Sequence, residues 1–228
     1  MKNHTVKTAF IHTLPVMTGY LFLGIGFGII LRQNGYGVLW AAAMSVFIYA
    51  GSMQYVAIGL LTGGASLATA ALTTLMVNAR HLFYGLSMID AYKGTGKRKP
   101  YLIFALTDET YSLVSHKPPE GVARTSYFFL VSLFDQCYWV VGSILGSLAG
   151  NLPVDFTGID FALTALFVTI FVEQWLSSGA HFPALVGVGS AAACLLLFGA
   201  EGFLIPTMVL IAAILILVPR PGKEDRDE

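Results

Sequence analysis

Two acidic residues, each followed by a glutamine, stand inside long apolar segments as Asp135–Gln136 and Glu173–Gln174. A charged side chain at the centre of a bilayer costs at least ~2.5–3.5 kcal/mol even on lenient insertion scales, so it is kept where it has a use. Because desolvation favours the neutral form of a carboxyl group, such acids suit a cycle of proton binding and release. We predict that Asp135 and Glu173 couple transport to protons. The alternative is a neutral, hydrogen-bonded carboxyl group that holds two helices together.

A second polar group, Asn78, Arg80 and His81, interrupts another apolar stretch. Arg80 needs a counter-charge, which is either an acid on a neighbouring helix or the carboxylate of a substrate, held by two parallel hydrogen bonds. A position near the helix end, from which the side chain reaches the membrane surface, is the alternative. Asp108 and Glu109, in a short apolar segment, are further candidates for proton coupling, as is His81, whose imidazole titrates near neutral pH.

The run Tyr49-Ala50-Gly51-Ser52-Met53-Gln54 interrupts a third apolar segment. A break in a membrane helix frees backbone groups, and the N-termini of half-helices carry partial positive charge that binds a carboxylate. A zwitterionic amino acid needs such a cradle together with an apolar pocket for its side chain. The predicted substrate-binding residues are Tyr49, Gly51, Ser52, Gln54, Asn78, Arg80 and Gln174.

The elements that must position these residues are helices in a membrane. Of the 228 residues, 56% are hydrophobic and 11% are charged, whereas a soluble domain carries about 25% charged residues. We therefore predict an all-α integral membrane protein with a single transmembrane domain whose main solvent is the lipid bilayer. A spanning helix needs roughly 20 apolar residues. The seven or eight hydrophobic segments cover residues 14–31, 38–61, 65–89, 101–115, 127–148, 159–176, 182–198 and 203–218.

The basic residues predict how the first segments cross the membrane. Lys2 and Lys7 precede the first segment, and the run K-G-T-G-K-R-K at 93–99 follows the third. Short loops rich in Lys and Arg prefer the cytoplasm, but three complete crossings would put these clusters on opposite sides. A re-entrant pair of half-helices with its tip at 49–54 removes the conflict and leaves the N-terminus cytoplasmic. The alternative is that the second segment crosses normally and the charge rule is violated locally.

A weak internal repeat predicts two related halves. A shift of 120 residues aligns Gly26 with Gly146 and Gln54 with Gln174, and the chain has only four glutamines. Repeats with interrupted helices at matching positions point to a transporter site. The predicted halves are residues 10–90 and 125–219, joined by a linker and short segment over 91–124 and followed by a polar tail over 220–228.

Small residues predict tight helix packing. Gly24 and Gly28 form G-x-x-x-G in the first segment, and Gly142, Gly146 and Gly150 extend the same spacing in the fifth. In lipid such faces let two helix backbones approach closely.

Other chemistries have little support in the sequence. The chain contains neither H-E-x-x-H nor G-x-x-x-x-G-K-[ST], so we expect no metal, cofactor or enzymatic activity. The basic run at 93–99 lies beside a helix end and indicates topology, not nucleic-acid binding. Ser178 with His181 leaves an intramembrane enzyme as an alternative, although a Ser–His pair also needs geometry and an oxyanion site.

The motifs taken together resemble the AzlC-like family, the large subunits of bacterial branched-chain amino acid exporters. The resemblance covers nearly the whole chain in order. It is carried by F-I-Y-A-G-S-M-Q at 47–54, N-A-R-H-L-F-Y-G at 78–85, L-T-D-E-T-Y at 106–111, D-Q-C-Y-W-V-V-G at 135–142 and D-F-A-L-T-A-L-F at 160–167.

The resemblance implies a multi-pass protein of the bacterial cell (inner) membrane that works with a small AzlD-like membrane subunit. It implies export of leucine, isoleucine, valine and sometimes methionine, driven by protons. The positions that match the family motifs are Tyr49, Gly51, Ser52, Gln54, Asn78, Arg80, His81, Asp108, Glu109, Asp135 and Gln136. The alternative function is that of a non-transporting scaffold that stabilises another membrane subunit.

Overall fold

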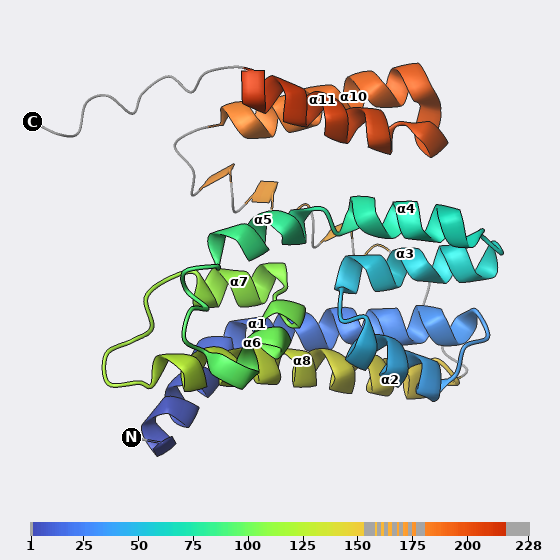
Figure 1. Ribbon diagram of the computed structural model, residues 1–228. Coiled ribbons are helices and arrows are strands. Elements are labelled where there is room, and N and C mark those ends of the chain that lie inside the picture. Colours follow the sequence, from blue (N-terminus) through green and yellow to red (C-terminus); the bar gives the residue numbers. More distant parts are fainter. Residues whose placement is uncertain are drawn as a thin grey trace, which may run out of the picture. The chain divides into compact units, whose positions relative to one another are not determined.

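The computed structural model describes residues 2–152 and 181–217, with scattered positions between 158 and 176. The chain divides into two compact units, Met1–Thr164 and Ala165–Glu228. Within the described ranges every regular element is a helix (Figure 1), which confirms the all-α prediction. Among the residues that the structure describes, three helices are long and apolar enough to cross a membrane, and shorter apolar helices accompany them.

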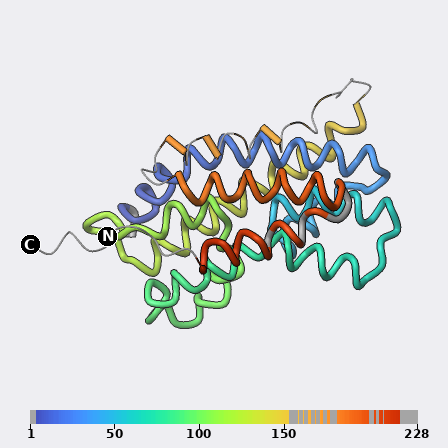
Figure 2. The backbone as a smooth tube through the Cα atoms, turned by 90° about the horizontal axis from the view of Figure 1, so that it is seen from above, coloured from blue at the N-terminus to red at the C-terminus, as the bar shows by residue number. Residues whose placement is uncertain are grey.

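Two long helices pack against each other along the first unit. They are α1 (Lys2–Gln33) and α8 (Arg124–Ala149). Helix α1 runs from one end of the unit to the other, as two views show (Figure 1, Figure 2). We expected the first helix to begin near Leu14, but it begins at Lys2 because its first turns also pack against neighbouring helices: Ala9 is fully buried.

Glycines let α1 and α8 touch backbone to backbone, as the two G-x-x-x-G patterns predicted. A Cβ atom placed on Gly24 would lie 3.0 Å from the Trp139 carbonyl oxygen, and one on Gly28 would lie 2.5 Å from the Ser147 amide nitrogen. A Cβ on Gly142 would lie 2.9 Å from the carbonyl oxygen of Leu21. These distances leave no room for a side chain, so the glycines set the separation of the two helices.

The second hydrophobic segment reverses direction, as predicted. It consists of α2 (Val38–Phe47) and α3 (Gly51–Thr62). Tyr49 between them has a φ of 44°, a left-handed conformation that is unusual for an aromatic residue. Its side chain is 3% exposed, and this burial holds the strained residue in place. Figure 1 shows that α3 returns toward the end of the unit from which α2 started.

The third segment is also broken, which the sequence analysis did not predict. We expected one helix over 65–89, but α4 (Leu67–Val77) ends with Asn78 as its C-cap, and α5 (Arg80–Ser87) begins two residues after this cap. Asn is a residue that favours helix ends, since its side chain competes for backbone hydrogen bonds. The two half-helices continue in the same overall direction across the unit (Figure 1).

The short fourth segment forms a second reversal. It contains a 3-10 turn, η1 (Gly96–Arg98), followed by α6 (Lys99–Phe104) and α7 (Asp108–Val114). Thr107 ends the break as the N-cap of α7, because its side-chain oxygen accepts a hydrogen bond from the Thr110 amide at 3.3 Å. Val114 then packs beside Ala9, so α7 returns to the end of the unit where α1 begins.

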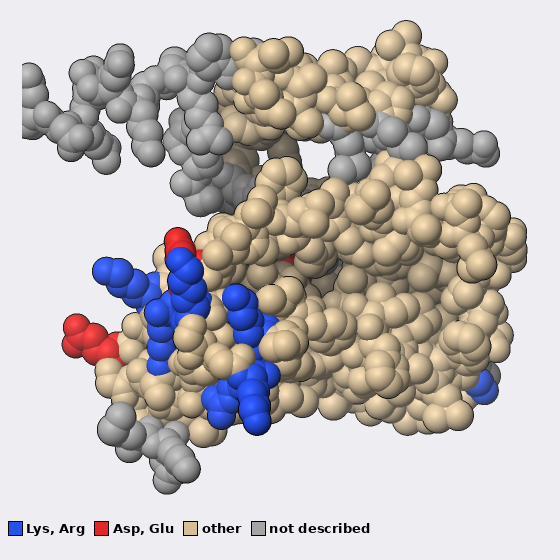
Figure 3. Space-filling view, viewed as in Figure 1, with Lys and Arg blue, Asp and Glu red and all other residues tan. Residues whose placement is uncertain are grey.

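The basic residues gather at that same end, as Figure 3 shows. Arg98 Nη1 donates to Ser126 Oγ at 3.2 Å, and the Ala123 amide donates to Thr5 Oγ1 at 3.4 Å. At the opposite end, Arg32 Nε donates to Asn151 Oδ1. The N-terminus and the basic run at 93–99 therefore lie at the same end of the first unit (Figure 1, Figure 3), as the hypothesis of a re-entrant second segment requires.

The second unit contains a helical hairpin. It is formed by α10 (Phe182–Gly202) and α11 (Leu204–Leu217). Inside α10, Gly199 has a φ of 70°, which kinks the helix before the turn. These helices confirm the last two predicted segments. Glu173, Gln174 and Ser178 lie outside the described residues.

Candidate functional site

Arg80, at the start of α5, joins the tips of both hairpins of the first unit. Its Nη2 donates to Ser52 Oγ in the first turn of α3 at 2.7 Å. Its Nη1 forms an ion pair with Asp108 Oδ2 at the start of α7. The side chains of Arg80 and Asp108 are 31% and 23% exposed, so the pair is largely withdrawn from the surface. Of the two counter-charges considered for Arg80, the structure contains the acid on a neighbouring helix.

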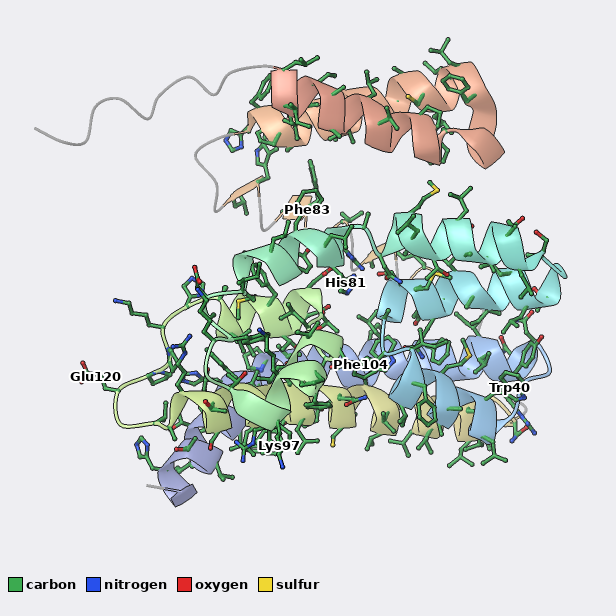
Figure 4. All side chains as sticks on the ribbon, viewed as in Figure 1. Trp40, His81, Phe83, Lys97, Phe104 and Glu120 are labelled. Carbon is green, nitrogen blue, oxygen red and sulfur yellow. The ribbon has the colours of Figure 1, made fainter. Side chains whose placement is uncertain are left out.

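The breaks lie at the middle of the unit's length. In Figure 4, His81 and Phe104 mark the start of α5 and the end of α6, while Trp40 and Glu120 lie toward opposite ends. The ring of Tyr49, at the first hairpin tip, lies 6.3 Å from that of Phe104, at the second. Two hairpins that enter from opposite ends therefore meet at the centre.

Two of the helix starts at this point have no side-chain cap. The N-cap residues of α3 and α5 are Ala50 and Ala79, and neither makes a side-chain capping bond. Helix N-termini carry partial positive charge that favours an anionic group. Together with the Arg80 guanidinium, they make this centre suited to a carboxylate.

Two further carboxyl groups accept hydrogen bonds from hydroxyl groups in the same unit. Glu109 Oε2 accepts a hydrogen bond from Tyr20 Oη of α1 at 2.7 Å. Asp135 of α8 is fully buried, and its Oδ2 accepts from Thr110 Oγ1 at 2.9 Å. Its other oxygen, Oδ1, is buried without a hydrogen-bond partner among the described residues. Asp135 is thus not in an aqueous loop, as the proton-coupling prediction requires.

Gln54 ties the first hairpin to α8. Its Nε2 donates to Ser45 Oγ at 3.2 Å, and its Oε1 accepts from Trp139 Nε1 at 2.8 Å. Ser45 Oγ in turn donates to Ser143 Oγ at 2.8 Å. A Cβ atom on Gly51 would lie 3.0 Å from the Trp139 ring. In this structure Gln54 and Gly51 therefore position the hairpin tip.

The structure brings several of the predicted residues together. Tyr49, Ser52, Arg80, Asp108 and Glu109 lie at or beside the meeting breaks. The remaining candidates in this unit are Gly51, Gln54, Asn78, His81 and Asp135. The amide oxygen of Asn78, at the second break, is buried without a hydrogen-bond partner in the described part of the chain. The ring of His81 interacts with the preceding turn, where its Nδ1 lies 3.2 Å from the Asn78 carbonyl oxygen. Gln136 accepts from Tyr101 Oη at 2.8 Å and connects α8 to α6.

The hydroxyl groups around these acids were not predicted from the sequence. Tyr20 donates to Glu109 and Thr110 donates to Asp135, while Thr107 bonds to the hydroxyl groups of Tyr20 and Thr110. Thr107 was detectable, because Thr followed by Asp and Glu before an apolar run is typical of a helix start. Tyr20 lies in the interior of α1 with no comparable signal. Within the described ranges no group of three His, Cys, Asp or Glu side chains is arranged to hold a metal ion.

Comparison with known proteins finds a family that matches most of the first unit. The model of the family described as AzlC protein matches residues 15–152, which contain every residue of the site in the first unit. The chain belongs to the AzlC family. The resemblance found in the sequence motifs is thereby confirmed.

Three relatives show the range of the AzlC family. The branched-chain amino acid transport protein AzlC of Bacillus subtilis (strain 168) is 43% identical over 94% of this chain and 85% of its own length. An uncharacterized membrane protein of Helicobacter pylori (strain J99) is 45% identical over 92% of this chain and 93% of its own. Inner membrane protein YgaZ of Escherichia coli (strain K12) is 28% identical over 72% of this chain and 70% of its own length. No solved structure matches the chain.

Proposed function

We propose that this AzlC-family chain is a transporter subunit that exports branched-chain amino acids from a bacterial cell. The observation that carries the proposal is that Arg80 joins two hairpin tips, Ser52 of one and Asp108 of the other, at the centre of the first unit. Discontinuous helices with their ends at mid-membrane are the usual site of substrate binding in secondary transporters. The similarity to a branched-chain amino acid transport protein of Bacillus subtilis supports the substrate class.

The ion pair suits a zwitterion. The α-carboxylate of an amino acid would replace Asp108 on the Arg80 guanidinium, assisted by the N-termini of α3 and α5. The α-ammonium group would then pair with the Asp108 carboxylate. Arg80 and Asp108 would each exchange one partner for another, and both substrate charges would be paired. The aromatic side chains of Tyr49 and Phe104 at the two tips offer an apolar surface for a branched side chain.

The hairpin arrangement suits alternating access. The pair α2–α3 enters from the end opposite the N-terminus, and the pair α6–α7 enters from the basic end. Movement of either tip opens the centre to one side only. In the orientation we propose, the basic end faces the cytoplasm, and the inner membrane is crossed several times, with α1, the α4–α5 pair and α8 among the crossings.

Protons are the proposed driving force, through Asp135, Glu109 and Asp108, with His81 and Glu173 as further candidates. The second half of the predicted repeat, with Gln174 as a candidate for substrate binding, stays part of this proposal. The apolar side chains that α4 and α5 expose, such as Leu67 at 90% and Phe83 at 71%, suit contact with lipid or with a small AzlD-like subunit.

Flux measurements in liposomes test the proposal. The chain is reconstituted with and without its small subunit, and uptake of labelled leucine is followed with an imposed pH gradient. We expect Arg80→Gln to lower uptake at least 10-fold, since a hydrogen bond to a charged group is worth about 1.5–3 kcal/mol. Arg80→Lys keeps the charge and is the matched control. If the wild-type chain carries no amino acid under either condition but stabilises the small subunit, it is a scaffold.

A further inference from the structure

An unbroken row of hydroxyl groups connects Glu109 to Asp135. Tyr20 Oη donates to Glu109 Oε2 at 2.7 Å and lies 2.6 Å from Thr107 Oγ1. Thr107 Oγ1 donates to Thr110 Oγ1 at 3.1 Å, and Thr110 Oγ1 donates to Asp135 Oδ2 at 2.9 Å. Tyr20, Thr107, Thr110 and Asp135 are between 0% and 7% exposed. Water therefore has little access to the intermediate hydroxyl groups.

The number of hydrogen atoms in this row is informative. The row contains four oxygen–oxygen links, from Glu109 through three hydroxyl groups to Asp135. Each hydroxyl group supplies one hydrogen, and an ionised carboxylate supplies none. With both acids ionised, three hydrogens serve four links, and one buried link has no hydrogen. With one added proton on either acid, every link has one.

We propose that Glu109 and Asp135 share a single proton through a relay formed by Tyr20, Thr107 and Thr110. In one state the carboxylic acid of Glu109 donates to Tyr20, each hydroxyl group donates to the next, and the carboxylate of Asp135 accepts. In the other state the acid is Asp135 and all four hydrogen bonds point the other way. Passage between the states breaks four O–H bonds and forms four, so the net charge does not change.

The relay gives the buried acid a route to the substrate site. Asp135 is fully buried, whereas Glu109 is partly exposed and follows Asp108 of the ion pair. Other charged or titratable groups face the two acids. Asp108 and Arg80 lie near Glu109, and the phenols facing Asp135 are Tyr49, Tyr101, Tyr127 and Tyr138. The use of the relay in transport rests on the proposed function, but the sharing of one proton rests on the hydrogen-bond geometry alone.

Amide variants imitate the two states. Glu109→Gln supplies an N–H group that donates to Tyr20, so all four links are complete with Asp135 ionised. Asp135→Asn supplies an N–H group that donates to Thr110, so the links are complete with Glu109 ionised. Each single variant should therefore release the shared proton, although it removes only one acid.

The experiment is infrared spectroscopy of the purified full chain at neutral pH, with the protonated-carboxyl band as the readout. We expect Glu109→Gln, Asp135→Asn and the double variant to lose the same band area, equal to one carboxyl group. If the double variant loses twice as much as either single variant, the acids bind protons independently and the relay is overturned. The relay is also overturned if either single variant loses nothing.

Thr110 offers a second test that does not alter an acid. Thr110→Val removes the hydroxyl group at nearly constant shape, whereas Thr110→Ser keeps a hydroxyl group at this position. In liposomes we expect Thr110→Val to lose uptake driven by a pH gradient but to keep exchange of labelled for unlabelled leucine, while Thr110→Ser keeps both. Wild-type rates of both processes in Thr110→Val, or loss of both, would overturn the relay. Absence of any leucine flux in the wild type contradicts the proposed function instead, and the infrared result then decides the relay.

Discussion

Gly146 in α8 offers the sharpest structural prediction, because its neighbours are backbone atoms that cannot move aside. A Cβ atom on Gly146 would lie 2.7 Å from both the carbonyl carbon and the Cα atom of Ile25, and it would contact the Ile25 carbonyl oxygen even more closely. Alanine at this position therefore requires α1 and α8 to separate. The same two helices are in close contact at Gly24 and Gly28, so the separation also loosens those contacts.

The cost follows from two opposing terms. Overpacking a closely packed site costs typically ~1–3 kcal/mol, and the backbone clash places Gly146→Ala at the upper end of that range. Replacing glycine by alanine inside a helix returns about 0.8–1 kcal/mol. We expect a net loss of about 2 kcal/mol of unfolding free energy, which is roughly a 30-fold change in the folded-to-unfolded ratio.

Unfolding in mixed detergent micelles, followed by circular dichroism, measures this loss. Gly19→Ala is the matched control, because it lies in α1 and a Cβ atom there meets nothing within 4 Å. That variant should be neutral or slightly more stable than the wild type. If Gly146→Ala is as stable as Gly19→Ala, the close approach of α1 and α8 is wrong.

Three further predictions concern the meeting hairpins. Asp135→Asn should abolish leucine uptake driven by a pH gradient and spare leucine exchange, and equal loss of both would remove Asp135 from proton coupling. Asp108→Asn removes the carboxylate proposed to receive the ammonium group of the substrate and should weaken leucine binding about 10-fold or more, measured by calorimetry; unchanged affinity would contradict that role. Gly51→Ala presses on the Trp139 ring, 3.0 Å from the new Cβ, and should shift the tryptophan fluorescence; a spectrum identical to that of the wild type would show that the hairpin tip is free to move.

Part of this architecture was predictable from the sequence. Hydrophobic composition predicted helices in a membrane, and the conflict between the two basic clusters favoured a reversal near Tyr49, which the structure has. The glycine spacing of the first and fifth segments predicted their close contact. These features depend on composition, on the positions of charged residues and on the spacing of glycines, all of which can be read from a single sequence.

The convergence of the breaks was not predictable in the same way. Asn78 was seen as a polar residue inside one helix, because apolar periodicity continues on both sides of it and gives no sign of an end. Whether Arg80 meets Asp108 or the membrane surface depends on how two hairpins pack, and the sequence left both open. Tyr20 lies 87 residues before its hydroxyl partner Thr107 along the chain. Only the packing of α1 against α7 brings them together.

Calorimetric binding of leucine and leucinol to the reconstituted protein tests the central claim, that Arg80 at the meeting hairpins receives the carboxylate of the substrate. Leucinol keeps the ammonium group and the side chain but lacks the carboxylate. We predict that leucine binds the wild type but not Arg80→Gln, and that leucinol binds neither. Leucinol affinity equal to that of leucine, or full leucine affinity in Arg80→Gln, would contradict the claim.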